Sequence, residues 1–353
     1  MTGHAASRAD PRLALLLDSA TPFYLPLSRP FRGVTVREGL LLRGPSGWGE
    51  FAPFPEYDVR VASRWLSAAV EAAFGSWPEP RRESIPVNAI IPAVTASVAA
   101  DLTAEAVALD GCTTIKVKVA QAGETLADDV ARVAAVRDAL TAAGVTSGKI
   151  RVDANAAWTV AEAIAAIEAI ASAADGLEYV EQPCRSLPEL AAVGAAVETL
   201  IAADESIRFA ANPAAAVRAG NIDIAVIKVP PLGGVRAALA VADAVGIPVV
   251  VSGAMDSSVG LAPGLALAAA LPESYFACGL GTGSLLAADV IDFPVRPTGG
   301  RLSVTRTDPD PAALLAASAR MSTSRQAWWR RRLEMAWSAG ANQYCGDLVA
   351  AAL

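Results

Sequence analysis

The sequence predicts an α/β protein in which a (β/α)7β TIM-like barrel is joined to an α+β capping domain. Three observations predict this fold: the length, a regular alternation of strands and helices in the middle, and a different pattern at each end. The chain has 353 residues, of which 53% are hydrophobic, which is long for one ordinary domain and sufficient for a large core. We expect 1–85 to form the N-terminal part of the capping domain, 86–290 the barrel with the functional site, and 291–353 a C-terminal segment packed on either part.

Short β-branched runs alternate with Ala-rich amphipathic stretches through the middle of the chain. Two of the intervening helices open with a capping-box pattern, at 159–162 and 186–189. Repeated strand–helix units of this kind predict a parallel barrel. A doubly wound open sheet is the alternative, but the first strand is not followed by the GxGxxG pattern of a dinucleotide-binding fold. The predicted strands are 86–92, 113–119, 149–153, 177–181, 200–204, 222–228, 248–252 and 275–279.

The two ends of the chain follow other patterns. Residues 34–42 begin with strand-like alternation, and a Gly-Pro-Ser-Gly turn at 44–47 leads to 48–51, which predicts a β-hairpin. Residues 61–74 are predicted to be helical. After residue 290 the barrel rhythm stops, and 311–339 is a predicted helical region. These segments are expected to form the capping part of the molecule.

Composition excludes several classes of partner. The net charge is −7, with 29 basic and 36 acidic side chains, so no nucleic acid is expected as a partner. No run reaches the roughly 18 apolar residues of a membrane span, and the start of the chain lacks the pattern of a signal peptide. We therefore expect no membrane association and a cytoplasmic location. The sequence leaves the oligomeric state open, with a monomer as the working expectation.

Cysteine and histidine usage limits the chemistry. The four cysteines form no CxxC pair, which argues against a zinc site and fits a reducing compartment. The single histidine, His4, lies in the N-terminal tail, which argues against a Ser-His-Asp triad or a His-rich metal site. Acid–base groups would then be Lys, Asp, Glu or Tyr, and metal ligands would be oxygens. The cysteines are Cys112, Cys184, Cys278 and Cys345.

Two lysines lie on one face of the second predicted strand. Lys116 and Lys118 are two residues apart, so their side chains point the same way. Their apolar neighbours suit the side that faces the helices, which turns both lysines toward the barrel interior. Buried ammonium groups are costly unless an anion meets them. The alternative is that they are surface lysines on an edge strand.

The next three strands each deliver a carboxylate at the end where barrel active sites lie. These are Asp153, Glu181 and Asp204. Three carboxylates so placed would repel one another, and a divalent cation would resolve this; all-oxygen ligands favour Mg²⁺ or Mn²⁺. Each carboxylate taken alone would be read as a helix N-cap. Arg151 and Asn155 share the face of Asp153.

A further lysine, Lys228, ends the sixth predicted strand. Strands two and six lie opposite each other in an eight-stranded barrel, so Lys118 and Lys228 would flank the metal and its ligand. This arrangement suits removal of a proton next to the carboxylate of a small-molecule substrate. A carboxylate-binding barrel without catalysis is the alternative, although such a module has no reason to place lysines on both sides of one ligand.

Taken together, the motifs Lys-x-Lys, Asp-x-Asn, Glu-Gln-Pro and Asp-Glu and the strand-six lysine resemble the muconate-lactonizing-enzyme subgroup of the enolase superfamily. The resemblance covers nearly the whole chain. It implies a capping domain, built from both ends of the chain, over the barrel. It also implies Mg²⁺ held by the three carboxylates, Lys118 as acid/base and Lys228 as the opposing lysine, with Lys116 the next candidate for the base. The lack of a barrel histidine excludes the mandelate-racemase subgroup.

Within that subgroup, the chain resembles the o-succinylbenzoate synthase family. In that family an arginine two residues before the metal aspartate meets a substrate carboxylate, which implies this role for Arg151. The loop after strand seven is also similar to that of the family. Strand eight lacks the Asp-x-Asp of dipeptide epimerases, and its Gly-Thr-Gly departs from better-known synthases. The other implied substrate-binding residues are Asn155, Ser252, Gly253, Gly281 and Thr282.

The resemblance implies a Mg²⁺-dependent dehydration of 2-succinyl-6-hydroxy-2,4-cyclohexadiene-1-carboxylate to 2-succinylbenzoate, a step of menaquinone biosynthesis. An N-succinylamino-acid racemase or a muconate-cycloisomerase-like enzyme is the alternative activity. The apolar loop 51–57 is expected either to help close the pocket or to pack between the domains.

Overall fold

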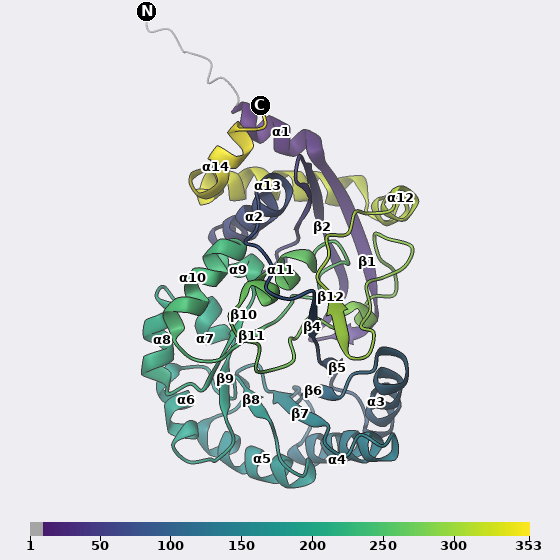
Figure 1. Cartoon of the computed structure of the whole chain (residues 1–353), viewed down its shortest axis with the longest axis vertical. Coiled ribbons are helices and arrows are strands. Elements are labelled where there is room, and N and C mark those ends of the chain that lie inside the picture. Colours follow the sequence, from purple (N-terminus) through teal and green to yellow (C-terminus); the bar gives the residue numbers. More distant parts are fainter. Residues whose placement is uncertain (1–9) are drawn as a thin grey trace, which may run out of the picture.

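The computed structural model describes residues 10–353; His4 lies outside this range. Seven parallel strands form one curled sheet in the order β11-β10-β9-β8-β7-β6-β5, with helices around its outer side (Figure 1). This is the predicted α/β barrel. The strands are β5 (Ala89–Ile91), β6 (Thr114–Lys118), β7 (Lys149–Asp153), β8 (Tyr179–Glu181), β9 (Ile201–Ala203), β10 (Ile224–Ile227) and β11 (Val249–Val251). The helices are α3 (Ala96–Asp110), α4 (Leu126–Ala142), α5 (Val160–Ala173), α6 (Leu187–Gly194), α7 (Glu205–Arg208), α8 (Pro213–Gly220), α9 (Val229–Leu232), α10 (Val235–Val245) and α11 (Ala262–Ala270).

A very short eighth segment closes the barrel. Cys278 and Gly279 make parallel bridges to Val87 on one side and Ser252 on the other. The predicted strand 275–279 is thus reduced to its last two residues. The chain passes very close to its neighbours here, since a Cβ added to Gly279 would lie 2.7 Å from the Ser252 Oγ. Small residues at this point therefore let the sheet close.

The strand ends are level on the side of the barrel that carries the pocket. Lys118 is paired with Asp153, and Asp153 with Glu181. One alternation deeper, Lys116 is paired with Arg151. The apolar residues between them face the helices and form the main core. The period-two pattern of the sequence therefore sorts charged side chains inward and apolar ones outward.

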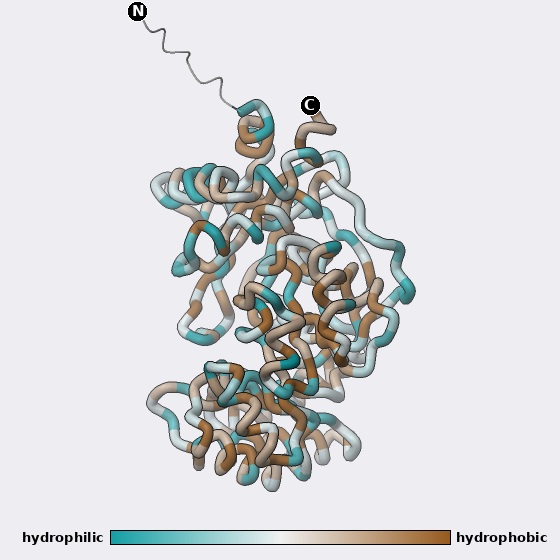
Figure 2. Tube along the Cα trace, turned by 90° about the vertical axis from the view of Figure 1, so that its left-hand side faces the viewer, coloured by the Kyte–Doolittle hydropathy of each residue, from teal (hydrophilic) through white to brown (hydrophobic). Residues whose placement is uncertain are grey.

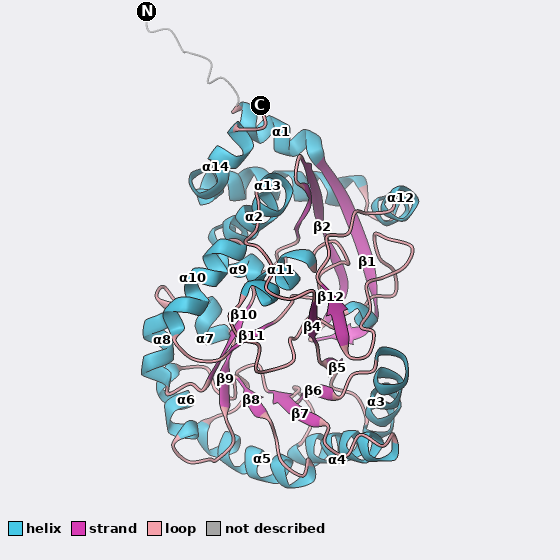
Figure 3. Ribbon diagram, viewed as in Figure 1, coloured by secondary structure: helices cyan, strands magenta, loops and turns pink. Residues whose placement is uncertain are grey.

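Both ends of the chain build the capping region above the barrel (Figure 3). An antiparallel sheet, in the order β1-β2-β3, packs with helices from the N- and C-terminal segments. Leu16, Trp65, Trp329 and Trp337 belong to one shared core cluster, so the C-terminal segment returns to the N-terminal one. The elements are α1 (Pro11–Ser19), β1 (Ala20–Phe31), β2 (Val34–Gly44), β3 (Gly47–Phe51), α2 (Val59–Phe74), α12 (Pro311–Ala319), α13 (Thr323–Ala336), the π-helical turn η2 (Trp337–Ala341) and α14 (Asn342–Ala350).

The predicted hairpin is β2–β3, but the sequence analysis missed β1. This strand contains Pro22, Pro26 and Pro30, and proline cannot donate to a sheet ladder. It is tolerated because β1 lies at the edge of the three-stranded sheet. The β1–β2 turn carries Arg32, with φ 52°, down toward the barrel.

The remaining elements join the two regions. A small antiparallel sheet pairs β4 (Ser84–Pro86) with β12 (Arg301–Ser303), and η1 (Gly283–Leu285) is a short 3₁₀ turn.

Figure 2 shows hydrophobic segments running through the barrel half of the molecule. Between residues 10 and 353, no helix has the length and apolar character needed to span a membrane. All four cysteines are buried and unpaired.

Candidate active site

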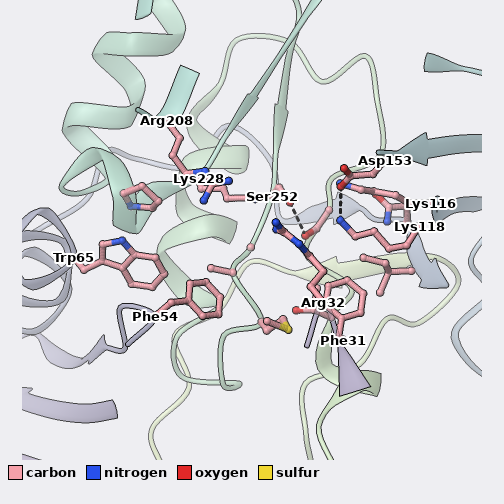
Figure 4. A pocket seen from close by; sticks show the side chains of 18 of the residues that line it. Phe31, Arg32, Phe54, Trp65, Lys116, Lys118, Asp153, Arg208, Lys228 and Ser252 are labelled. Atoms are coloured by element: carbon pink, nitrogen blue, oxygen red, sulfur yellow. Dashed lines mark hydrogen bonds and ion pairs between the residues drawn. The ribbon is translucent and has the colours of Figure 1, made fainter. Parts of the chain in front are cut away.

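A pocket lies where the carboxyl ends of the barrel strands face the capping region. Its barrel side is lined by charged residues from β6 and β7 and by Lys228, which directly follows β10, and its capping side by aromatic residues (Figure 4). In Figure 4, Lys116, Lys118 and Asp153 lie on one side, and Lys228 and Arg208 lie on the other. Arg32 reaches between them.

The first charged wall is a compact cluster of buried ion pairs. The Lys118 Nζ lies 2.5 Å from the Asp153 Oδ2 and donates to the Asn155 Oδ1 at 2.8 Å. The Lys116 Nζ lies 2.5 Å from the Glu181 Oε2 and 3.0 Å from the Asp153 Oδ2. Lys116 and Lys118 are 5% and 7% exposed, so the alternative of surface lysines is excluded. The two lysines therefore share the predicted inward face, and the carboxylates of Asp153 and Glu181 are their partners.

The two lysines of this wall differ in acidity. Burial lowers the pKa of Lys118 to about 8, and the charge of Lys116 contributes in the same direction against the attraction of Asp153. Burial also acts on Lys116, but the Asp153 and Glu181 carboxylates outweigh it and raise the pKa of Lys116. Lys118 is thus the lysine that can release and accept a proton near neutral pH, while Lys116 stays charged.

The opposite wall is built around Asp204 at the end of β9. The Lys228 Nζ lies 2.6 Å from the Asp204 Oδ2, and the Arg208 Nε lies 3.2 Å from the Oδ1. Arg208 also donates to the hydroxyl of Tyr57 from the capping region at 2.7 Å. Although burial opposes ionisation, Lys228 and Arg208 lower the pKa of Asp204 to about 2. Asp204 therefore stays ionised and links two cations.

The three carboxylates carry the oxygen donors that Mg²⁺ prefers. In the part of the chain that the structure describes, no three His, Cys, Asp or Glu side chains converge closely enough to enclose an ion, and lysine ammonium groups occupy the positions beside the carboxylates. One buried oxygen, the Glu181 Oε1, has no hydrogen-bond partner among the described residues. Burial and repulsion from Asp153 raise the pKa of Glu181 to about 7. Additional positive charge would favour the ionised form of this carboxyl group, so the donor chemistry and the unpartnered oxygen suit a metal ion, although the described side chains do not enclose one.

The capping wall is mainly aromatic, apart from Arg32. Phe54 packs against Tyr57 and Trp65 with ring centroids 5.4 Å and 6.0 Å apart, and all three line the pocket. The loop 51–57 lines the pocket through Phe54 and Tyr57, as one of the two expectations had it, whereas Phe51 is buried in the capping core. The indole N–H of Trp65 has no partner in the described chain.

Arg151 is not brought to the pocket. It is fully buried one layer below Asp153, where its Nε lies 2.5 Å from the Glu178 Oε2 and its Nη1 donates to the Ala277 carbonyl at 2.7 Å. The guanidinium also stacks over Tyr179, 4.7 Å from the ring centroid. These contacts place Arg151 within the barrel interior, with a protein carboxylate as its partner.

Of the other residues expected to bind substrate, some line the pocket and others do not. Ser252, Gly253 and Thr282 line the pocket, whereas Gly281 does not. A Cβ on Gly281 would lie 2.6 Å from the Asn88 carbonyl oxygen, so this glycine permits close packing of the chain. The Thr282 Oγ1 is buried and unpartnered among the described residues, which leaves it free to bond a ligand. Asn155, which was expected to bind substrate, is not among the lining residues, and its side chain accepts a hydrogen bond from Lys118.

Sequence reasoning missed several pocket residues, among them Arg32, Trp65 and Arg208. Arg208 had a usable signal, since it lies four residues after Asp204 in a predicted strand-to-helix segment, where a basic residue can reach back to the carboxylate. Arg32 and Trp65 belong to the capping region, whose position over the barrel no local pattern reveals.

Two family models match large parts of the chain. The family model described as enolase C-terminal domain-like matches residues 98–309, and the one described as enolase N-terminal domain-like matches 23–73. Curated proteins named o-succinylbenzoate synthase are similar over most of the chain. The protein from Mycobacterium tuberculosis (strain H37Rv) is 49% identical over 93% of this chain and 96% of its own length. The protein from Thermobifida fusca is 51% identical over 87% of this chain and 96% of its own length.

Solved structures share the fold at lower identity. Muconate lactonizing enzyme from Pseudomonas fluorescens, complexed with muconolactone, is similar with a TM-score of 0.71 and 19% identity over 85% of this chain and 97% of that one. A dipeptide epimerase from Enterococcus faecalis, complexed with Mg and a dipeptide, is similar with a TM-score of 0.67 and 23% identity over 82% of this chain and 97% of that one.

Proposed function

The chain belongs to the o-succinylbenzoate synthase family of the enolase superfamily, and we propose that it dehydrates 2-succinyl-6-hydroxy-2,4-cyclohexadiene-1-carboxylate to 2-succinylbenzoate in menaquinone biosynthesis. The observation that carries this proposal is the pair of lysines on opposite walls of one pocket, each bonded to a buried strand-end carboxylate. Such a pocket suits a carboxylate substrate whose α-proton is removed. The enzyme is thus a carbon–oxygen lyase.

Lys118 is the proposed base. Its lowered pKa allows the neutral amine to accept the proton beside the substrate carboxylate. The same ammonium group then returns that proton to the departing hydroxyl, so that water leaves and the ring becomes aromatic. The bonds to Asp153 and Asn155 fix the position of the Lys118 Nζ during both transfers.

Lys228 and Lys116 are proposed to supply positive charge. Lys228 lies across the pocket from Lys118, where it stabilises the electron-rich ring as the proton leaves. Lys116, whose pKa is raised by its two carboxylate partners, holds those carboxylates in place and is unsuited to act as the base.

Asp153, Glu181 and Asp204 are the proposed ligands of Mg²⁺ (or Mn²⁺). A bound Mg²⁺ would supply positive charge beside the substrate carboxylate. The unpartnered Glu181 Oε1 and the repulsion between the three carboxylates support this assignment. Ser252 and Thr282, which line the pocket, are proposed to bond the substrate.

We also propose a cytoplasmic location, which the unpaired state of all four described cysteines supports.

The purified protein with Mg²⁺ and the cyclohexadiene carboxylate tests the function. The expected result is catalytic loss of the diene absorbance with stoichiometric formation of 2-succinylbenzoate, identified by mass. A parallel reaction with an N-succinyl amino acid in D₂O measures proton exchange as a side activity. Absence of diene turnover, together with efficient exchange on the amino acid, would refute the proposed reaction.

A further inference from the structure

We infer that Arg37, which lies behind the capping wall, is a positioning residue that holds two parts of the substrate pocket in register: Phe54 and the loop 252–257 after β11. This inference rests on the proposed function only for the choice of substrate. Arg37 lies on β2, is 2% exposed, and is not among the residues that line the pocket.

Arg37 bonds both parts directly. Its Nε donates to the Met255 carbonyl at 3.1 Å, and its Nη2 donates to the Ala52 carbonyl at 2.8 Å. The guanidinium plane also lies over the Phe54 ring, 4.5 Å from its centroid. Met255 and Phe54 both line the pocket. One buried side chain of the capping sheet therefore sets where a capping loop and a barrel loop meet.

A second anchor acts on the same barrel loop. Glu50, on β3, accepts from the Ser257 backbone N–H at 3.1 Å and from the Ser257 hydroxyl at 2.5 Å. Its other oxygen lies 4.0 Å from the Arg37 Nη2. The approach is close, since a Cβ on Gly260 would lie 2.4 Å from the Glu50 Oε2. Both ends of the segment from Met255 to Ser257 are thus tied to the capping sheet.

The tied loop has a conformation that requires support. Met255 has φ 61°, in the left-handed region that non-glycine residues rarely adopt. The loop begins at Ser252 and Gly253, which also line the pocket. Loss of the Arg37 bond would let Met255 relax and would shift the wall on which the substrate lies.

The contacts of Arg37 to Ala52, Phe54 and Met255 form a clamp between the two regions. The reacting lysines are held independently of this clamp. Lys118 and Lys228 are bonded to Asp153, Asn155 and Asp204 from other strands. Release of the clamp should therefore weaken substrate binding more than it slows the chemical step, which is a rise in KM with a small change in kcat.

The test compares Arg37→Met with Arg306→Met. Arg306 is a control with similar contacts, although it is exposed and Arg37 is buried. Its guanidinium also donates to two backbone carbonyls, of Ser46 and Ala72, at 2.7 Å each, and stacks on the ring of Trp77, 3.6 Å away. It touches no pocket residue. We expect Arg37→Met to raise KM at least about tenfold with kcat within about threefold, and Arg306→Met to leave both unchanged.

Hydrogen exchange of peptides that cover 252–258 is measured on the same variants without substrate. Faster exchange in Arg37→Met, and not in Arg306→Met, is expected. This arm separates failure of the clamp from failure of the proposed reaction. Ser257→Ala removes the hydroxyl bond to Glu50. It should raise KM and the exchange rate by less than Arg37→Met does, and it replaces Arg37→Met in the test if that variant does not fold. Unchanged KM and unchanged exchange in the folded variant, or a fall in kcat alone, would overturn the inference.

Discussion

The two walls of the pocket differ in how they are built. The barrel wall consists of buried ion pairs, in which three lysines and an arginine meet three strand-end carboxylates within 3.2 Å. The capping wall is mainly aromatic, and Arg37 behind it contacts the Phe54 ring and the backbone carbonyls of Ala52 and Met255. From this difference we expect the barrel wall to supply the charges for the chemistry and the capping wall to shape the binding of the substrate. Substitutions on the two walls should therefore separate kcat from KM.

The largest expected effect is on the barrel wall. Lys118→Ala removes the proposed base, so kcat should fall by about 10²–10⁴-fold, the usual contribution of a positioned acid–base group. Lys149→Ala is the control, because Lys149 is exposed at the start of the neighbouring strand β7. Steady-state assays of both variants give the comparison. Wild-type turnover in Lys118→Ala would show that another group takes the proton.

Arg208 bridges the two walls, and its loss should affect both constants. Arg208→Met leaves Asp204 with Lys228 as its cation and removes the partner of the Tyr57 hydroxyl. A charged hydrogen bond of about 1.5–3 kcal/mol predicts a loss of roughly 10–100-fold in kcat/KM. Tyr57→Phe is the milder comparison and should raise KM alone. Equal effects of the two variants would mean that Arg208 acts only through Tyr57.

Substitution of Arg151 tests whether a buried charged residue of the barrel can contribute to stability without contributing to substrate binding. Its charged partner is Glu178, and it also donates to the side chain of the pocket residue Asn88. Arg151→Met should lower the free energy of unfolding by about 3 kcal/mol, because Glu178 is left without its partner. KM at a temperature where the variant is folded should stay within about threefold of the wild type. Urea unfolding and steady-state kinetics measure the two effects. A large rise in KM without loss of stability would return Arg151 to substrate binding.

The smallest expected effect concerns the capping anchor Glu50. Burial, with a contribution from Asp256, raises the pKa of Glu50 from 4.5 to about 7. The folded state keeps the proton that the unfolded state loses, so this group's contribution to stability is lost as pH rises from about 4.5 to about 7. The unfolding free energy of the wild type minus that of Glu50→Gln should therefore be smaller at pH 8 than at pH 5. An identical difference at both pH values would show that Glu50 titrates normally.

More of the barrel wall than of the capping wall could be predicted from the sequence. Period-two alternation and strand ends are local properties, so Lys116, Lys118 and Asp153 could be placed on one inward face before the fold was known. Parity gives the face but not the depth, which is why Arg151 shares the face of Asp153 and yet lies below the pocket.

The capping wall depends on contacts between distant segments. Arg37 and Met255 are 218 residues apart, and no periodic pattern relates them. The strand that delivers Arg32 was missed because its prolines indicate a loop unless the edge position in the sheet is known. Local sequence patterns thus predict the charged residues of this site better than the shape of the pocket that binds the substrate.

Metal dependence tests the account of the barrel wall most directly. The protein is dialysed against a chelator, assayed with the cyclohexadiene carboxylate, and then titrated with Mg²⁺. The three buried carboxylates predict that turnover disappears with the chelator and returns with Mg²⁺, while Asp204→Asn stays inactive throughout. Full turnover in the chelated wild-type protein would contradict the account.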